Sequence, residues 1–188
     1  MTTPGGVTQV LAELAAGNSD AAVKLLPLVY DELRTLADRY LRDEPRDHTL
    51  QGTALVHEVY IRMVGRNERS CESRAHFFAV AASAMRRILV DHARRRRAAK
   101  RGGDRHKFSL EQVLEPSDYR YEYLVALDDA LTDLASIDEQ PARVVELRFF
   151  GGLSVDETAE VLGVAPITVK RMWKLARGWL HREITKGD

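Results

Sequence analysis

Apolar residues recur at helical spacing along most of the chain, and no stretch alternates convincingly with a period of two. The helices predicted by this pattern cover residues 18–44, 53–64, 73–99 and 138–149. We expect Pro27 to kink the first of them near its start. A further amphipathic helix is predicted by the steps of three, four and three that separate Leu124, Leu127, Leu131 and Leu134. The sequence therefore predicts an all-α fold.

A stretch with the composition of a linker separates two helical units. Residues 100–120 contain Gly102, Gly103, Pro116 and scattered charges. We therefore expect two small helical domains joined by a flexible linker. The expected bounds are 1–17 for an N-terminal tail or short helix, 18–99 for the first domain, 100–121 for the linker and 122–188 for the second domain.

The second unit contains the pattern of a helix-turn-helix. Ser154 and Glu157 have the spacing of a capping box, which starts a helix. Gly163 suits the tight turn that follows, and Pro166 suits the first turn of the next helix.

The last helix is expected to have an apolar face and an adjacent cationic face. At 100° per residue its apolar residues lie within about 60° of arc; they are Val169, Trp173, Ala176 and Leu180. The cations lie about 110° away; they are Lys170, Lys174, Arg177 and His181, extended by Arg171. This is the geometry of a recognition helix that shows Lys and Arg to the major groove. The alternative is a helical hairpin with a solvated basic face.

Charge changes this picture along the chain, although 28 basic and 28 acidic side chains give a net charge of zero. Residues 86–107 hold ten Lys/Arg and two acids, a net charge of +8. Residues 108–146 hold ten acids and two Arg, a net charge of −8. The basic block indicates a footprint for a polyanion, and the acidic block either shields it or meets a basic partner. Two solvated helix faces are the alternative.

Several classes of protein are excluded or disfavoured. Cys71 is the one cysteine, so an internal disulfide and a Cys-based zinc site are excluded. The longest apolar run, 77–85, is about half the roughly 18 residues of a membrane span, and the N-terminus lacks the pattern of a signal peptide. A nuclease or other enzyme is disfavoured because no metal cluster, phosphate-binding glycine loop or nucleophile elbow is present. We expect a soluble, cytoplasmic protein with no cofactor.

Three ordered segments resemble bacterial sigma factors of the extracytoplasmic-function (ECF) type. They read TALVHEVYIRMV at 53–64, HFFAVAASAMRRILVDHARRRRAAKRGG at 76–103 and ARVVELRFFGGLSVDETAEVLGV at 142–164, and TVKRMWKLARGWLHRE at 168–183 continues the last one. The resemblance covers about residues 10–186. It implies a protein that binds core RNA polymerase and directs promoter-specific transcription initiation through sigma domains two and four.

The resemblance also assigns site residues. The clamp helices of the largest polymerase subunit are contacted by Leu55, Val56, Glu58, Val59 and Arg62, and the flap region is a further polymerase contact. The residues that open and read the −10 element are among Arg74, His76, Phe77, Arg86, Arg87, Asp91 and His92. Some of these must belong to the hydrophobic core instead. Phe77 suits packing in the core about as well as contact with a base. Arg94, Arg95, Arg96 and Arg97 contact backbone phosphates. The −35 element is read by Thr168, Lys170, Arg171, Lys174 and Arg177.

The chain departs from the family pattern before Leu55 and at Ala165. Many members carry several acids before the position of Leu55, whereas this chain has none there and reads Gln51-Gly52-Thr53-Ala54. A phosphate on Thr53 restores about −1.5 to −2 charges, so one hypothesis is that a Ser/Thr kinase licenses polymerase binding. The alternative is that Thr53 is an ordinary N-cap. At Ala165 many members have Ser, so the hydroxyl cap of the last helix is missing.

Two further matters stay open at this level. An anti-sigma factor, a kinase or expression level can each control such a protein. A stand-alone helix-turn-helix regulator that binds duplex DNA without polymerase is the competing function. A basic helix followed by an acidic segment suggests that DNA binding by the free chain is masked, which favours the sigma factor.

Overall fold

The computed structural model describes residues 4–18, 20–41, 51–65, 71, 73–99 and 121–186. All regular structure in these ranges is helical, which confirms the predicted all-α fold. The N-terminal half holds α1 (Pro4–Ala15), α2 (Asp20–Leu41), α3 (Gly52–Gly65) and α4 (Arg74–Ala99). The C-terminal half holds α6 (Tyr121–Ile137), α7 (Glu139–Val145), the π-helical turn η1 (Glu146–Phe150), α8 (Val155–Leu162) and α9 (Pro166–Lys186).

The predicted helices agree closely with these bounds. The expected helix at 18–44 corresponds to α2, which continues past Pro27, and the expected helix at 73–99 corresponds to α4. The leucine seam of α6 is completely buried, with Leu127 and Leu131 at 0% exposure. The expected linker at 100–121 lies outside the described residues, apart from Tyr121, which begins α6.

The helix expected at 138–149 is correct in place and wrong in form. It starts as predicted, with the Asp138 side chain accepting a hydrogen bond from the N–H of Gln140 (3.1 Å). From Glu146 it widens to a π-helical turn, and the Gly151 N–H donates to the carbonyl of Glu146 five residues earlier (3.3 Å). The wider turn lets both Phe149 and Phe150 be buried, at 3% and 0% exposure. This packing gain lies in the tertiary structure and leaves no signal in a helical pattern.

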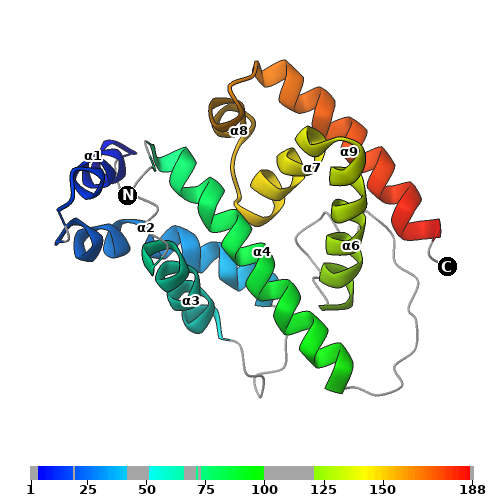
Figure 1. Ribbon diagram of the computed structural model, residues 1–188, viewed down its shortest axis with the longest axis horizontal. Coiled ribbons are helices and arrows are strands. Elements are labelled where there is room, and N and C mark those ends of the chain that lie inside the picture. The colour runs from blue at the N-terminus through cyan, green and yellow to red at the C-terminus, as the bar shows by residue number, and fades with distance from the viewer. Residues whose placement is uncertain are drawn as a thin grey trace.

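Helix α4 lies between α1, α2 and α3 of its own half and α6, α7 and α9 of the C-terminal half (Figure 1). One hydrophobic cluster runs through both halves; it includes Leu33, Phe78 and Leu89 from the first and Leu127, Leu131 and Phe150 from the second. The two predicted units are therefore packed together on α4, a feature that the helical patterns did not predict.

Glycines permit the close approach of the second half to α4 and α2. A Cβ on Gly151 would lie 2.9 Å from the Cβ of Ala82 in α4 and 2.6 Å from the carbonyl oxygen of Leu147. Gly152 has φ +67°, a conformation that L side chains rarely adopt, and it packs on Leu36 of α2. The hydroxyl of Tyr40 completes the junction by donating to the carbonyl of Phe149, which satisfies a polar group in the core.

Candidate nucleic-acid and partner interfaces

The helix-turn-helix forms as the sequence predicts. Ser154 accepts a hydrogen bond from the Glu157 N–H (3.2 Å), and the Glu157 carboxylate accepts one from the Ser154 N–H (2.8 Å), which is a complete capping box. Gly163 ends α8 in the left-handed conformation, at φ +64°. Burial alone would raise the pKa of Glu157, but the hydrogen bonds at Ser154 and the charge of Arg74 hold it below its ordinary value.

Helix α9 docks through its apolar side. Val169, Ala176 and Leu180 are fully buried, at 0% exposure. Val169 packs with Val144 and Ala159, so the helix is fixed against α7 and α8. The Arg148 guanidinium lies 4.5 Å from the centroid of the Trp173 ring, which adds a cation–π contact to this seat. The predicted docking of this face on its own domain is confirmed.

The face of α9 next to this apolar side carries the predicted −35 contacts. The exposed members are Lys170, Arg171, Lys174 and Arg177. At 100° per residue Lys170, Lys174 and Arg177 fall within about 60° of arc, and Arg171 lies about 60° beyond. Thr168 is half-buried and lies about 160° from Lys170, so it does not share this face.

One residue of this face was not predicted from the sequence. Ile167 is 55% exposed at the start of α9, between the arcs of Lys170 and Arg171. An exposed apolar side chain within a cationic arc suits contact with a thymine methyl group. The signal in the sequence was an isoleucine outside the apolar seam of its helix.

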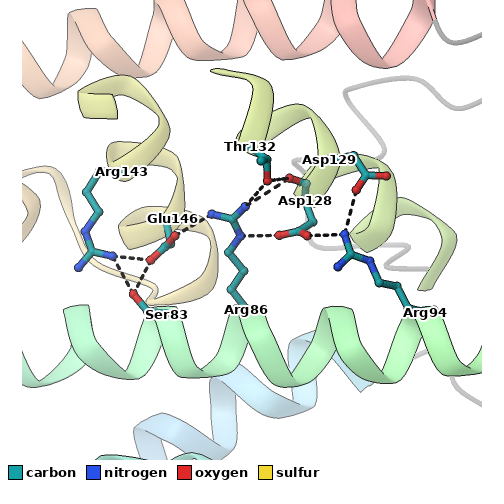
Figure 2. A network of polar contacts seen from close by, with 8 residues as sticks. All are labelled: Ser83, Arg86, Arg94, Asp128, Asp129, Thr132, Arg143 and Glu146. Atoms are coloured by element: carbon teal, nitrogen blue, oxygen red, sulfur yellow. Dashed lines mark hydrogen bonds and ion pairs between the residues drawn. The ribbon is translucent and has the colours of Figure 1, made fainter. Parts of the chain in front are cut away.

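In the second half of α4, the predicted −10 cations Arg86 and Arg94 are engaged by acids of α6 and η1. Arg86 donates through Nε to Asp128 (2.7 Å) and through Nη1 to Glu146 (2.8 Å). Arg94 donates to Asp128 (3.0 Å) and to Asp129 (2.9 Å). Figure 2 shows these side chains of α4 pointing toward α6 and η1, where the carboxylates lie.

Burial and pairing set the electrostatics of this network. The side chains of Arg86, Asp128 and Glu146 are only 18%, 14% and 12% exposed. Burial alone would raise the pKa of Glu146, but the hydrogen bond from Ser83 and the charges of Arg86 and Arg143 hold it below its ordinary value. Burial alone would lower the pKa of Arg86, but Glu146 and Asp128 more than offset this and hold it above its ordinary value. Arg86 and Glu146 are therefore both charged at neutral pH.

The other predicted −10 residues of α4 have different surroundings. Arg87, Arg95 and Arg97 are exposed. The partly exposed members are His76, Asp91, His92 and Arg96. Phe77 is 2% exposed and makes an edge-to-face contact with Phe78, so it serves packing rather than recognition of a base.

Arg74 begins α4 and lies between carboxylates of both halves. Its guanidinium pairs with Glu32 of α2 and with Glu157 of α8, and it lies 4.7 Å from the centroid of the Phe78 ring. Ser73 beside it donates to Glu160 of α8 (2.7 Å). In this arrangement Arg74 joins the two halves instead of facing outward to a nucleic acid.

The predicted polymerase-binding helix, α3, presents a different set of residues. Leu55, Val56 and Val59 are fully buried, at 0% exposure, so they hold α3 in the core and present no side chain to a partner. Their helical spacing in the sequence is equally that of a core seam. Glu58 and Arg62 are partly exposed and pair with each other (2.7 Å).

The exposed face of α3 includes an apolar residue. Ile61 is 68% exposed, and Ala54 and His57 are exposed on the same side of the helix. The exposed Ile61 side chain, with the polar Glu58 and Arg62 beside it, suits the centre of a protein interface. The sequence signal was an apolar residue that falls outside the buried seam.

Helix α3 begins one residue before Thr53, at Gly52. The Leu55 N–H donates to the Gln51 carbonyl (3.0 Å), so Gln51 is at the N-cap position and Thr53 is not. Thr53 lies in the first turn of the helix and is half-buried. The Arg34–Asp38 ion pair of α2 (2.9 Å) packs against Gly52 so closely that a Cβ there would clash with it. The Asp38 carboxylate and the Arg34 guanidinium paired with it therefore both lie near the start of this helix, and the carboxylate is the nearer of the two.

A cavity of about 360 Å³ lies between α2, α4 and the start of α8, and Arg74, Glu32 and Glu157 line it. The Arg74 guanidinium already engages both carboxylates. Within the described ranges no cluster of three or more His, Cys, Asp or Glu residues has the arrangement of a metal site. No helix in that part of the chain is both long and apolar enough to cross a membrane.

Comparison with known proteins gives one family. The family model described as "ECF sigma factor" matches residues 4–186, which include both halves and the segment between them. A search of the curated proteins found no match.

Proposed function

Because the chain belongs to the ECF sigma factor family, we propose that it binds core RNA polymerase and directs the enzyme to promoters with defined −10 and −35 elements. The observation that carries this proposal is the family match across both halves, 4–186. A chain that used the helix-turn-helix alone has no need of the first half, with its exposed face on α3 and its basic helix α4.

The −35 element is read by the exposed face of α9. Lys170, Arg171, Lys174 and Arg177 supply cations for phosphates and guanine edges, and Ile167 supplies an apolar contact for a thymine methyl. The complete capping box and the buried Val169 hold this helix rigidly against its neighbours. Lys170→Ala and Arg171→Ala are expected to reduce −35-dependent initiation and to leave polymerase binding intact.

The −10 strand is held along α4. Exposed Arg87, Arg95 and Arg97 suit backbone phosphates, and they contribute affinity and salt dependence rather than sequence readout. Partly exposed His76 and His92 offer rings that can stack on an unpaired base. The C-terminal half covers Arg86, whereas Arg94 is 52% exposed and pairs with Asp128 and Asp129 of that half.

Core polymerase is bound through the exposed face of α3, with Ile61 at its centre and Glu58 and Arg62 beside it. Ile61→Glu places a charge in the middle of this interface and is expected to weaken polymerase binding at least tenfold, which corresponds to about 1.4 kcal/mol. Val23→Glu is the matched control, because Val23 is 77% exposed on α2. Equal binding by Ile61→Glu and Val23→Glu would remove α3 from the interface.

Polymerase binding is licensed by a phosphate on Thr53. Its support is the position of Thr53 in the first turn of α3, where the helix dipole favours an anion. A phosphate there would compete with Asp38 for the guanidinium of Arg34. The matched pair is Thr53→Glu, which adds charge, and Thr53→Val, which keeps the shape without it. Tighter polymerase binding by Thr53→Glu alone supports the switch; equal binding by both variants and wild type removes its basis.

The transcription chemistry belongs to the polymerase, and the proposed role requires neither catalysis nor a cofactor from this chain. It places the protein in the cytoplasm, where polymerase and promoter DNA are found. An anti-sigma factor that covers the exposed faces of α3 or α4 is the alternative to control by a kinase.

The competing function is a stand-alone regulator that uses α9 on duplex DNA. A competition assay separates the two. Labelled chain and purified bacterial core polymerase are mixed, and a known sigma factor is then added as competitor. Displacement by that factor supports the proposal, whereas tight binding to duplex DNA with no affinity for polymerase supports the regulator.

A further inference from the structure

The cavity between α2, α4 and the start of α8 has no role in the proposed function. Its volume of about 360 Å³ falls within the range of about 300–1,000 Å³ that small-molecule sites occupy. Part of its wall is apolar, because the buried side chains of Leu36, Phe78 and Leu153 line it together with Gly151 and Gly152. A small molecule that enters the cavity can therefore bury an apolar body against both halves of the chain.

Most of the charged groups in the wall are already paired with one another. The guanidinium of Arg74 pairs with the carboxylates of Glu32 and Glu157. Asp31 also lines the cavity, and it is exposed to solvent. The wall therefore carries three carboxylates, and two of them share the one cation at Arg74. This arrangement repels a ligand with several negative charges.

The other cation of the wall, Arg39, has no hydrogen bond or ion pair with any residue that the structure describes. Its side chain is half-buried, and its Nε is enclosed without an acceptor. Arg34 on the same helix, by contrast, is paired with Asp38 (2.9 Å). A guanidinium stays charged at neutral pH, and taking that charge out of water without an acceptor is unfavourable. A bound molecule can supply the acceptor through the terminal nitrogens, which are not enclosed as Nε is.

We propose that this cavity binds a small monocarboxylate with an apolar body. The carboxylate pairs with Arg39, and the body packs on the apolar part of the wall. The two oxygens of a carboxylate match the parallel N–H groups of a guanidinium, and the charges strengthen the contact. A phosphate ester carries more negative charge at neutral pH, which the carboxylates of the wall oppose. The inference goes beyond the proposed function and does not depend on it.

The test measures the midpoint of thermal unfolding of the full chain in the presence of acetate, butyrate, hexanoate or phenylacetate. A ligand at about ten times its Kd is expected to raise the midpoint by about 3–6 °C. Affinity is expected to rise along the straight-chain acids by about fourfold for each methylene group that is buried. The amides of the same acids match their shape without the charge, and they are expected to leave the midpoint unchanged. Inorganic phosphate is expected to leave it unchanged as well.

Arg39→Met shows whether this guanidinium binds the carboxylate, because the substitution removes the charge and keeps most of the aliphatic stem. It is expected to weaken binding of the tightest acid by about tenfold or more. Lys24→Met is the matched control, since Lys24 is exposed on the same helix, lies outside the cavity and makes the same change of net charge. Its affinity is expected to stay within about twofold of wild type.

A second variant covers the case in which Arg39→Met does not give a helical circular-dichroism spectrum. Arg39→Lys keeps the charge and loses the planar fork of the guanidinium, so it is expected to weaken binding by about threefold. The comparison of each acid with its amide needs no variant and stands in either case.

The expected result is binding of an acid that its amide does not share and that Arg39→Met loses while Lys24→Met retains it. No rise with any acid up to about 10 mM, tenfold above a Kd of about 1 mM, would overturn the proposal. So would an equal rise with an acid and its amide, or equal affinity of Arg39→Met and wild type. Tighter binding of phosphate than of every acid would overturn the assigned class of ligand. Polymerase is absent from the assay, so these results are separate from those that test the proposed function.

Discussion

Lys174→Ala tests most closely whether the exposed face of α9 meets DNA. Lys174 is exposed, and it shares an arc of about 60° with Lys170 and Arg177. A contact with a backbone phosphate releases counterions from duplex DNA, so each such contact contributes about 0.9 to the slope of log K against log salt. Loss of this contact should therefore lower the slope by about 0.9.

The same arithmetic gives the expected change of affinity. When the salt concentration rises from 50 to 200 mM, both proteins lose affinity for DNA. With a slope smaller by 0.9, the variant loses a factor about 3.5-fold smaller than wild type does. At fixed salt the variant is expected to bind up to about fivefold more weakly, which corresponds to about 1 kcal/mol for an exposed charge. A one-base mismatch in the −35 element should cost wild type and variant the same factor, because a phosphate contact carries no sequence information.

The assay is the binding of chain–polymerase complex to a fluorescent promoter duplex over a series of salt concentrations. Lys24→Ala is the matched control, because Lys24 is 57% exposed on α2 and pairs with Glu13 (3.2 Å). A slope for Lys174→Ala equal to that of wild type would refute the placement of this face on DNA. An equal drop in slope for Lys24→Ala would show that net charge, and not position, determines the effect.

Three further predictions concern the fold that holds these surfaces. Leu131→Ala should lower the free energy of unfolding by about 2–5 kcal/mol, because Leu131 has 0% exposure. Leu175→Ala should change this free energy little, because Leu175 is 57% exposed, and denaturant titration compares the two variants. Ser154→Ala should cost about 1 kcal/mol through loss of the capping box, measured as a lower midpoint of thermal unfolding. The folded state lowers the pKa of Glu146, so its ionised carboxylate stabilises the fold at pH values above the ordinary pKa of 4.5. This stabilisation is lost as the pH falls through the pKa of the folded state. Glu146→Gln should therefore flatten the loss of stability below pH 4.5, and an unchanged pH profile would contradict the pairing of this carboxylate.

Local signals predicted the helices and the helix-turn-helix well. The steps between the leucines of α6 identify its buried side, because a helix that packs by one face must repeat apolar residues near every 3.6 positions. The capping box at Ser154 and the turn at Gly163 are likewise set by chemistry within a few residues. Such features are readable because their partners are neighbours in the sequence.

Features that depend on distant partners were not predictable in the same way. The sequence shows that Arg86 is basic and Asp128 acidic, but their pairing depends on how the second half packs on α4. The π-helical turn at Glu146 ends in two phenylalanines, Phe149 and Phe150, that are buried in that packing. In α3, the spacing of Leu55, Val56 and Val59 suited either the core or an interface, and only the fold separates these roles.

The measurement that bears most directly on the central claim is the binding of the labelled chain to purified bacterial core RNA polymerase, with wild type and Thr53→Glu side by side. The account predicts binding by at least one form, displacement by a known sigma factor, and initiation at a promoter by the bound complex. No binding by either form, together with tight binding to duplex DNA alone, would contradict it and assign α9 to a stand-alone regulator.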